Sequence, residues 1–165
     1  MLLIHIMKSF INYLFIFGFI AVTVVSCVKK TTYPKAPQIE YKDFFPFTGD
    51  SGEIQIKFTD GDGNIGVGQD DTTNSLYVTY YYKDTLTNQY VGYYSQNIND
   101  TLKTGYVVRA PADSYKGKPI SGEVSVKLQA YRHSKKIKNV KYVIYLYDSE
   151  GNKSNVLTTP EISVP

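Results

Sequence analysis

Apolar and polar residues alternate along much of the chain, with the period of two that is typical of β-strands rather than helices. The alternation is clearest over residues 53–59, 124–130 and 140–147, where every second side chain is apolar. Such segments predict strands that bury one face. Further strand candidates are residues 39–44, 76–83, 89–94, 104–109 and 156–164, and the last contains Pro160, which suits an edge strand.

These strand candidates predict an all-β fold. Short strands separated by segments rich in Gly, Asp, Asn and Pro are typical of antiparallel sandwiches. We therefore expect an immunoglobulin-like or fibronectin-III-like antiparallel sandwich of about seven to eight strands over residues 39–165. A small open barrel is the alternative architecture.

The N-terminal region has a different pattern. Residues 9–28 form an uncharged apolar run that is long enough to cross a bilayer as a helix. Lys8 precedes the run and Lys29 follows it. The pattern fits either a permanent membrane anchor or a secretory signal peptide, and Met7 begins a more typical signal than Met1 does.

Cys27, the only cysteine of the chain, lies at the end of this apolar run and directly before a polar segment. Residues 24–27, Val-Val-Ser-Cys, resemble the lipobox of bacterial lipoproteins, in which the cysteine is acylated and becomes the new N-terminus. The two valines depart from the residues most usual there. The alternative is an apolar cysteine in a spanning helix. The resemblance implies three regions: a lipoprotein signal peptide over residues 1–26, a lipidated Cys27 with a flexible tether over 27–38, and the sandwich domain over 39–165.

The composition narrows the classes of function. The 165 residues carry a net charge of +3, which does not favour a nucleic-acid partner. One cysteine and two histidines are too few for an internal disulfide or a zinc cluster. His133 lies in a lysine-rich turn, and no phosphate-binding or dinucleotide motif occurs. The sequence therefore indicates a protein that is not an enzyme.

One glycine-rich segment carries candidate metal ligands. Residues 60–71 place Asp60, Asp62 and Asn64 at alternate positions and end at Asp71. Ca²⁺ takes six to eight oxygen ligands in flexible geometry, and glycines permit the tight curl that directs alternate side chains inward. The segment partly matches an EF-hand loop, but Ile65 replaces the turn glycine and no helices are expected around it. We therefore expect a calcium loop of the DxDxN type on a β scaffold.

A second acidic loop is expected at the same end of the sandwich. In immunoglobulin order, residues 53–59 and 76–83 are strands B and C, and residues 139–147 and 156–164 are strands F and G. The B–C and F–G loops then lie together, which brings Asp148 to the candidate calcium loop. Carboxylates gathered at one pole repel one another unless a cation or hydrogen-bond donors offset their charge. The alternative is that these residues only cap turns through backbone hydrogen bonds.

Tyrosines are abundant, and the chain has no tryptophan. They cluster over residues 80–82 and 90–94, where alternation directs them to both faces of a sheet. Exposed tyrosines such as Tyr81 and Tyr93 would stack on sugar rings, which makes glycan binding an alternative function. Ordinary packing within the sheet explains the same cluster.

The lipobox-like start, the loop over residues 60–66 and the segment over residues 147–155 together resemble a group of small uncharacterised lipoproteins of Bacteroidota. Those proteins have a DGDG-type loop and an immunoglobulin-like fold. The resemblance implies a lipid anchor in the cell envelope, at the outer membrane, without a known enzyme activity. In that phylum acidic residues after the cysteine mark surface export, whereas Val28, Lys29 and Lys30 follow Cys27 here, so we expect the domain to face the periplasm, with the cell surface as the alternative. An envelope protein or a glycan is the expected partner. It also implies O-glycosylation in Asp-Thr triplets, for which the candidates are Thr72, Thr85 and Thr101.

Overall fold

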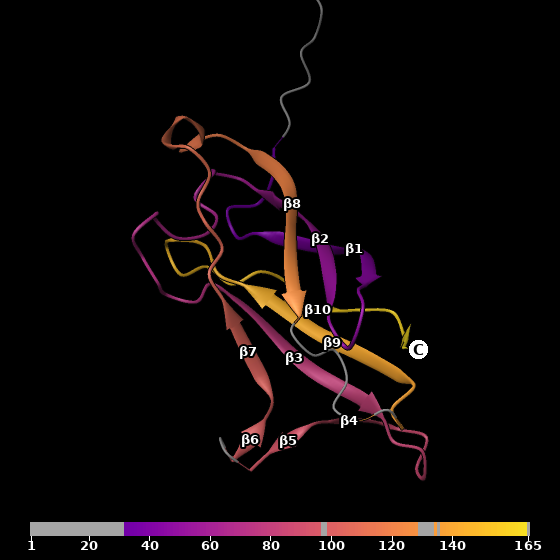
Figure 1. Cartoon of the computed structure of the whole chain (residues 1–165). Helices are drawn as coiled ribbons and strands as arrows, with labels where there is room; N and C mark the ends of the chain where they lie inside the picture. The colour runs from indigo at the N-terminus through magenta and orange to yellow at the C-terminus, as the bar shows by residue number, and fades with distance from the viewer. Residues whose placement is uncertain (1–31, 97–98, 129–133, 135, 165) are drawn as a thin grey trace, which may run out of the picture. The chain divides into compact units, whose positions relative to one another are not determined.

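The computed structural model describes residues 32–96, 99–128, 134 and 136–164, and these residues form an all-β structure (Figure 1). The expected signal peptide, Cys27 and the first part of the expected tether lie outside the described residues. Among the described residues, no helix has the length and apolar character needed to cross a membrane.

The smaller sheet has three antiparallel strands in the order β1-β2-β8 (Figure 1). They are β1 (Gln38–Pro46), β2 (Gly52–Asp60) and β8 (Ile120–Leu128). The alternation expected from the sequence is present in β2, where Ile54 and Ile56 are fully buried and Lys57 is exposed.

The larger sheet is centred on β3 (Leu76–Lys83) and β9 (Asn139–Leu146), which pair antiparallel over most of their length. Shorter strands extend it, namely β4 (Tyr90–Gly92), β7 (Lys103–Tyr106), β10 (Leu157–Thr158) and β11 (Ile162–Ser163). A separate pair joins β5 (Tyr94–Ser95) to β6 (Asp100–Thr101). The one helix of the described chain is a 3-10 turn, η1 (Asp113–Tyr115).

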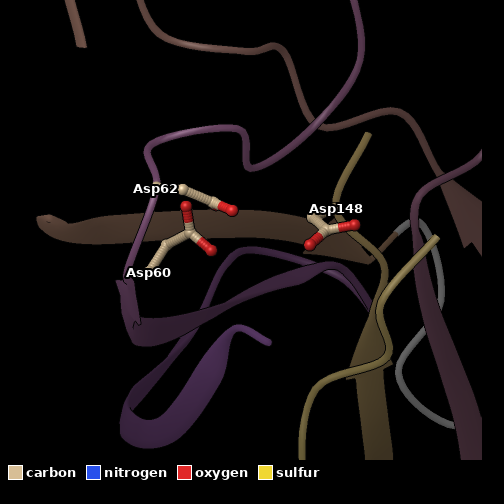
Figure 2. A group of neighbouring side chains, drawn as sticks. All are labelled: Asp60, Asp62 and Asp148. Carbon is tan, nitrogen blue, oxygen red and sulfur yellow. The ribbon is translucent and has the colours of Figure 1, made fainter. Parts of the chain in front are cut away.

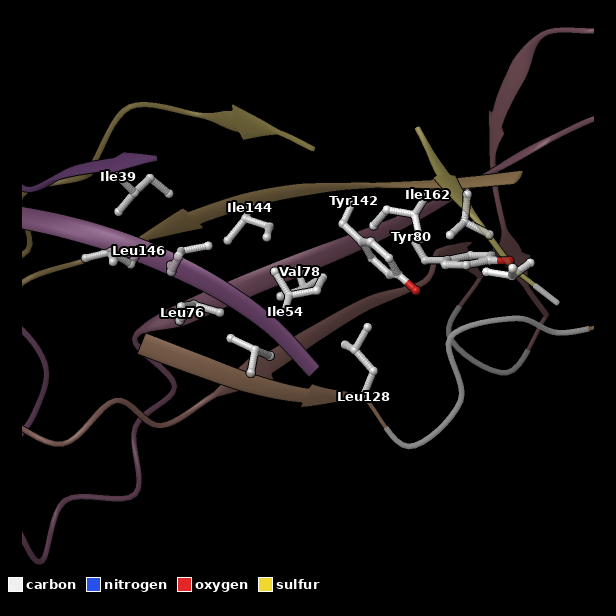
Figure 3. Packing of buried hydrophobic residues seen from close by; sticks show 14 of the residues in the cluster. Ile39, Ile54, Leu76, Val78, Tyr80, Leu128, Tyr142, Ile144, Leu146 and Ile162 are labelled. Carbon is white, nitrogen blue, oxygen red and sulfur yellow. The ribbon is translucent and has the colours of Figure 1, made fainter. Parts of the chain in front are cut away.

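The two main sheets enclose one apolar core, which gives the described chain a β-sandwich-like architecture (Figure 3). Side chains of the smaller sheet, such as Ile54 and Leu128, pack with Ile144 and Tyr142 of the larger sheet. Each fully buried side chain of this size contributes about 1.5–3 kcal/mol to folding. The antiparallel all-β fold expected from the sequence is therefore confirmed.

Several strands differ from the expectation. The segment 89–94 contributes to two short strands, β4 and β5, and β8 begins at Ile120, four residues before the expected 124–130. The segment 156–164 forms two strands of two residues each, and Pro160, which has no backbone N–H to donate, lies between them. The segment 104–109 leaves the sheet after Tyr106. Its next residues pair instead with the loop after β2, because Val67 N donates to Val108 O and Ala110 N donates to Val67 O.

The described chain enters the sandwich beside the loop that follows β2. Ile39 N donates a hydrogen bond of 2.7 Å to Asn155 Oδ1, and Asn155 Nδ2 donates one of 3.0 Å back to Ile39 O. Just before this clamp, the backbone of Tyr33 and Pro34 lies against Gly61. A Cβ on Gly61 would lie 2.5 Å from both carbonyl oxygens, so this approach requires glycine.

Candidate metal centre

The candidate loop begins at Asp60, the last residue of β2. The side chain of Asp60 is fully buried, although ionised carboxylates are rarely buried without a partner. Asn64 N donates a hydrogen bond of 3.0 Å to Asp60 Oδ2, which closes the loop on itself. The other carboxylate oxygen, Asp60 Oδ1, has no hydrogen-bond partner in the part of the chain that the structure describes.

Three carboxylates converge at this position, from Asp60, Asp62 and Asp148 (Figure 2). One oxygen from each lies within 4.8 Å of the others. Ca²⁺ binds oxygen at about 2.3–2.6 Å, so that two ligands of one ion lie at most about 5 Å apart. The spacing of the three carboxylates is therefore that of ligands around a single ion.

Several buried polar atoms of the loop lack hydrogen-bond partners among the described residues. Asp60 Oδ1, Asp62 Oδ1 and both polar side-chain atoms of Asn64 are buried without a hydrogen-bond partner in the described chain. Leaving such a group unpaired costs about 1–3 kcal/mol, and more when the group is charged, so folded proteins seldom do so. These atoms belong to the three alternate positions of the DxDxN pattern. The loop thus presents oxygens that nothing in the described protein satisfies.

Asp148 reaches the cluster from the loop after β9. Its carboxylate is held in place by hydrogen bonds from Glu150 N, Asn152 N and Asn152 Nδ2, at 2.7–2.9 Å. The two acidic loops are also joined through their backbones. Ile65 forms an isolated β-bridge with Asp148, and Ser149 N donates a hydrogen bond to Asn64 O. The expected meeting of the two acidic loops is therefore observed.

The surroundings of Asp60 shift the pKa of its carboxyl group. Burial raises the pKa of Asp60 above its ordinary value, and the nearby charges of Asp62 and Asp148 raise it further. Hydrogen bonds from the backbone of Asn64 and of Gly63 lower the pKa of Asp60 but do not reverse the shift. A cation between the carboxylates would favour their ionised forms and remove this penalty.

A third segment of the chain, residues 113–118, packs on the loop and was not expected from the sequence. Gly117 N donates a hydrogen bond of 2.6 Å to Asp62 O. Gly63 adopts a φ of +69°, and a Cβ there would lie 2.1 Å from Tyr115 O. The only signal in the sequence is the glycine spacing, which indicates a curled loop but not the segment that covers it.

Asp71 lies outside the cluster. The chain turns away at Gly66, and the loop is then held by Arg109, whose Nη1 donates to the carbonyl oxygens of Gly68 and Asp71. The carboxylate of Asp71 instead accepts hydrogen bonds from the side chain and backbone of Thr73, and these hold its pKa below the usual range. Asp71 therefore lies apart from the other candidate ligands, which are Asp60, Asp62, Asn64 and Asp148.

The two tyrosines considered for glycan binding lie in different environments. Tyr81 is half-buried and pairs with Lys141 on the outer side of the larger sheet. Tyr93 packs against Tyr80 and Tyr82 at the edge of the core, with ring centroids 6.3 and 6.4 Å apart. The sequence did not predict a second aromatic group. It consists of Tyr77 on β3, Tyr145 on β9 and Tyr147 directly after β9, whose rings contact one another.

The three glycosylation candidates differ in exposure. Thr72 and Thr85 are exposed in loops, whereas Thr101 is half-buried in β6. In two of the triplets the aspartate also closes a local turn, because Asp71 accepts from Thr73 N, and Asp84 accepts from Leu86 N and Thr87 N. The same triplets therefore have a structural role in the fold.

Comparison with known proteins finds no matching family model, no matching curated protein and no matching solved structure. The arguments for a function therefore come from the residues of this chain.

Proposed function

We propose that this chain is a non-catalytic, lipid-anchored module of the cell envelope whose sandwich binds one Ca²⁺ at the acidic pole. The observation that carries the proposal is the set of buried, unpartnered atoms at Asp60, Asp62 and Asn64, together with the carboxylate of Asp148. The ion would offset the repulsion between the carboxylates and would cross-link two loops. Its role is structural, because it stiffens one end of an interaction module.

Calcium is the cation that fits this chemistry best. The candidate ligands are all oxygens, from three carboxylates and one side-chain amide, and the described part of the cluster offers no sulfur or imidazole nitrogen. Zinc sites use mainly such nitrogen and sulfur ligands. Mg²⁺ requires near-ideal octahedral geometry and usually retains several waters, whereas an irregular loop suits the flexible coordination of Ca²⁺.

The order of the strands supports an immunoglobulin-like identity for the module. In immunoglobulin labels, the smaller sheet β1-β2-β8 corresponds to A-B-E, and β10-β9-β3 of the larger sheet corresponds to G-F-C. The acidic loops are then the B–C and F–G loops. In domains of this class those loops commonly carry binding functions, which is consistent with an interaction module.

A calorimetric titration tests the cation site directly. Residues 28–165 are expected to bind one Ca²⁺ per chain, and Asp62→Asn is expected to weaken binding at least tenfold because it removes a charged ligand. Asp71→Asn is the matched control, since the same change outside the cluster should leave binding intact. Absence of binding by the unmodified fragment would refute the proposal, as would equal losses in both variants.

The lipid anchor has a separate test. Metabolic labelling with a radioactive fatty acid should mark the full chain in a bacterial host that processes lipoproteins, and Cys27→Ser should abolish the label. Ser26→Ala is the control, because it keeps a small residue before the cysteine. Label that persists on the Cys27→Ser chain would show that the cysteine is not the acylated residue.

A further inference from the structure

The smaller sheet ends in a long strand whose outer edge has no partner among the described residues. β8 is nine residues long and pairs with β2 on one side only. Within the same described ranges, the outlying strands of the larger sheet are much shorter, with two residues in β10 and β11 and three in β4. A long free edge exposes a row of backbone N–H and C=O groups, which is a template for pairing with another strand.

The opposite edge of the same sheet is protected, and β8 is not. β1 carries an irregularity between Tyr41 and Asp43 and ends at Pro46, and both features discourage pairing with another chain. β8 contains no proline, and its register with β2 is unbroken from Ile120 to Leu128. The edge at β1 therefore has features that discourage pairing with another chain, and the edge at β8 has neither of them.

Charges on the outer face of the smaller sheet alternate in sign across the strands. Glu40 pairs with Lys57, and Lys57 pairs with Glu123 of β8. Two rows further along the same face, beyond the pair of Gln55 and Ser125, Glu53 lies opposite Lys127 of β8. The free edge thus carries Glu123, whose carboxylate also forms an ion pair of 2.6 Å with Lys42 Nζ of β1, and Lys127, four residues away. Both residues of β8 are exposed.

We propose that β8 pairs antiparallel with β8 of a second copy of this chain, with the two-fold axis at Ser125. This register places Glu123 opposite the partner's Lys127, and Lys127 opposite the partner's Glu123. Each row of alternating charge then continues across the interface. On the inner face, the half-buried Val124 lies opposite the partner's Val126, so that apolar surface at the edge is covered. The interface is isologous, as in most homodimers.

Other registers lack this complementarity. Sliding one strand by two residues removes both charge pairs, and sliding it by four places glutamate opposite glutamate or lysine opposite lysine. Sliding by one residue directs the apolar side chains to the wrong face. Opposite charges on facing strands stabilise a pair, and like charges destabilise it, so the sequence of β8 selects one antiparallel register.

The groove beside β8 provides room at this edge. It has a volume of about 450 Å³ and is lined on one side by residues of β8, including Val124 and Val126. The other side is formed by the segment that follows β7, with Val108, Arg109 and Pro111. A strand added to β8 would close the groove along its open side.

Charge reversal tests the proposal through the oligomeric state of residues 28–165, which contain the whole described core. Sedimentation equilibrium is expected to show a dimer for the unmodified fragment. Lys127→Glu and Glu123→Lys should each weaken dimerisation about tenfold or more, because both symmetric positions then bring like charges together. Lys103→Glu, the same reversal on β7 of the other sheet, is the control and should leave the dimer unchanged.

Mixing the two charge-reversed variants distinguishes the loss of a specific register from a general loss of folding. The Lys127→Glu and Glu123→Lys chains should form a heterodimer with each other, since unlike charges then face across the interface. Thermal unfolding of each variant verifies that it is folded. An unmodified fragment that stays monomeric at high micromolar concentration would overturn the proposal, and so would a dimer that both reversals leave intact or a mixture that fails to associate. The inference does not depend on the cation site.

Discussion

Millimolar Ca²⁺ is expected to raise the unfolding temperature of residues 28–165 by about 5 °C or more relative to EDTA. A ligand present at about 100 times its Kd stabilises the folded state by about 2.7 kcal/mol. In a domain of this size, each kcal/mol shifts the unfolding temperature by about 2–8 °C. The ion acts on the folded state alone, because the unfolded chain does not hold Asp148 beside Asp60 and Asp62. Differential scanning calorimetry in the two conditions makes the measurement.

The double variant Asp60→Asn/Asp62→Asn distinguishes ion binding from turn capping. It should lose the response to Ca²⁺, yet in EDTA it should be no less stable than the unmodified fragment. The reason is that burial raises the pKa of Asp60. A raised pKa means that the folded state binds more protons than the unfolded chain, so the free energy of unfolding falls as the pH rises from the ordinary pKa of the carboxyl group through the raised pKa of the folded state. Asparagine removes that charge and keeps an acceptor for Asn64 N.

Asp71→Asn serves again as the control and should retain the shift. If the double variant keeps the calcium response, or if it is strongly destabilised in EDTA, the acidic pole is a set of hydrogen-bonded turns and the ion has no role in it.

Gly63→Ala is expected to destabilise the fragment by about 2–4 kcal/mol and to reduce its response to Ca²⁺. The φ of +69° disfavours any residue with a side chain, and the new Cβ would lie 2.1 Å from Tyr115 O. Relief of the clash requires the loop and the segment 113–118 to separate, which also breaks the hydrogen bond from Gly117 N to Asp62 O. Urea denaturation with and without Ca²⁺ measures both effects.

Gly68→Ala provides the matched comparison within the same loop. Gly68 has no atom within 4 Å of its ideal Cβ position and does not adopt a positive φ. This substitution should therefore change the free energy of unfolding by less than about 1 kcal/mol. Equal behaviour of the two alanine variants would mean that the segment 113–118 does not pack on the loop in solution.

The fold was predictable from the sequence where one face of a strand is buried along its whole length. The segment 76–83 was predicted with its observed bounds, and 53–59 and 140–147 within one residue, because alternation marks a strand buried on one face. The C-terminal segment was predicted as one strand, since alternation does not reveal that β10 and β11 each pair only briefly with β9. Edge strands carry a weaker pattern because fewer neighbours constrain them.

The candidate site was predictable to the extent that it is local. Asp60, Asp62 and Asn64 follow from their spacing in the loop, and the arrival of Asp148 was expected because the segments 53–59 and 139–147 were predicted to end at the same pole of a sandwich. The exclusion of Asp71 could not be foreseen, since it depends on Arg109, which lies far along the chain and holds the loop by its backbone. The same holds for the cover formed by residues 113–118, because its contacts are made by backbone atoms that carry no sequence signature.

The entry of the chain beside Gly61 also determines how the domain would bear mechanical load. A pull on the chain before Thr32 would act first where the backbone of Tyr33 and Pro34 lies against the loop, and next at the clamp between Ile39 and Asn155. The contact at Gly61 precedes the first pair of β1 with β2, Gln38 with Thr59, whereas the clamp at Ile39 lies beside the start of that pairing. The resistance of a tethered domain to tension would then begin at the loop contact at its point of attachment, and the clamp would reinforce the first residues of β1.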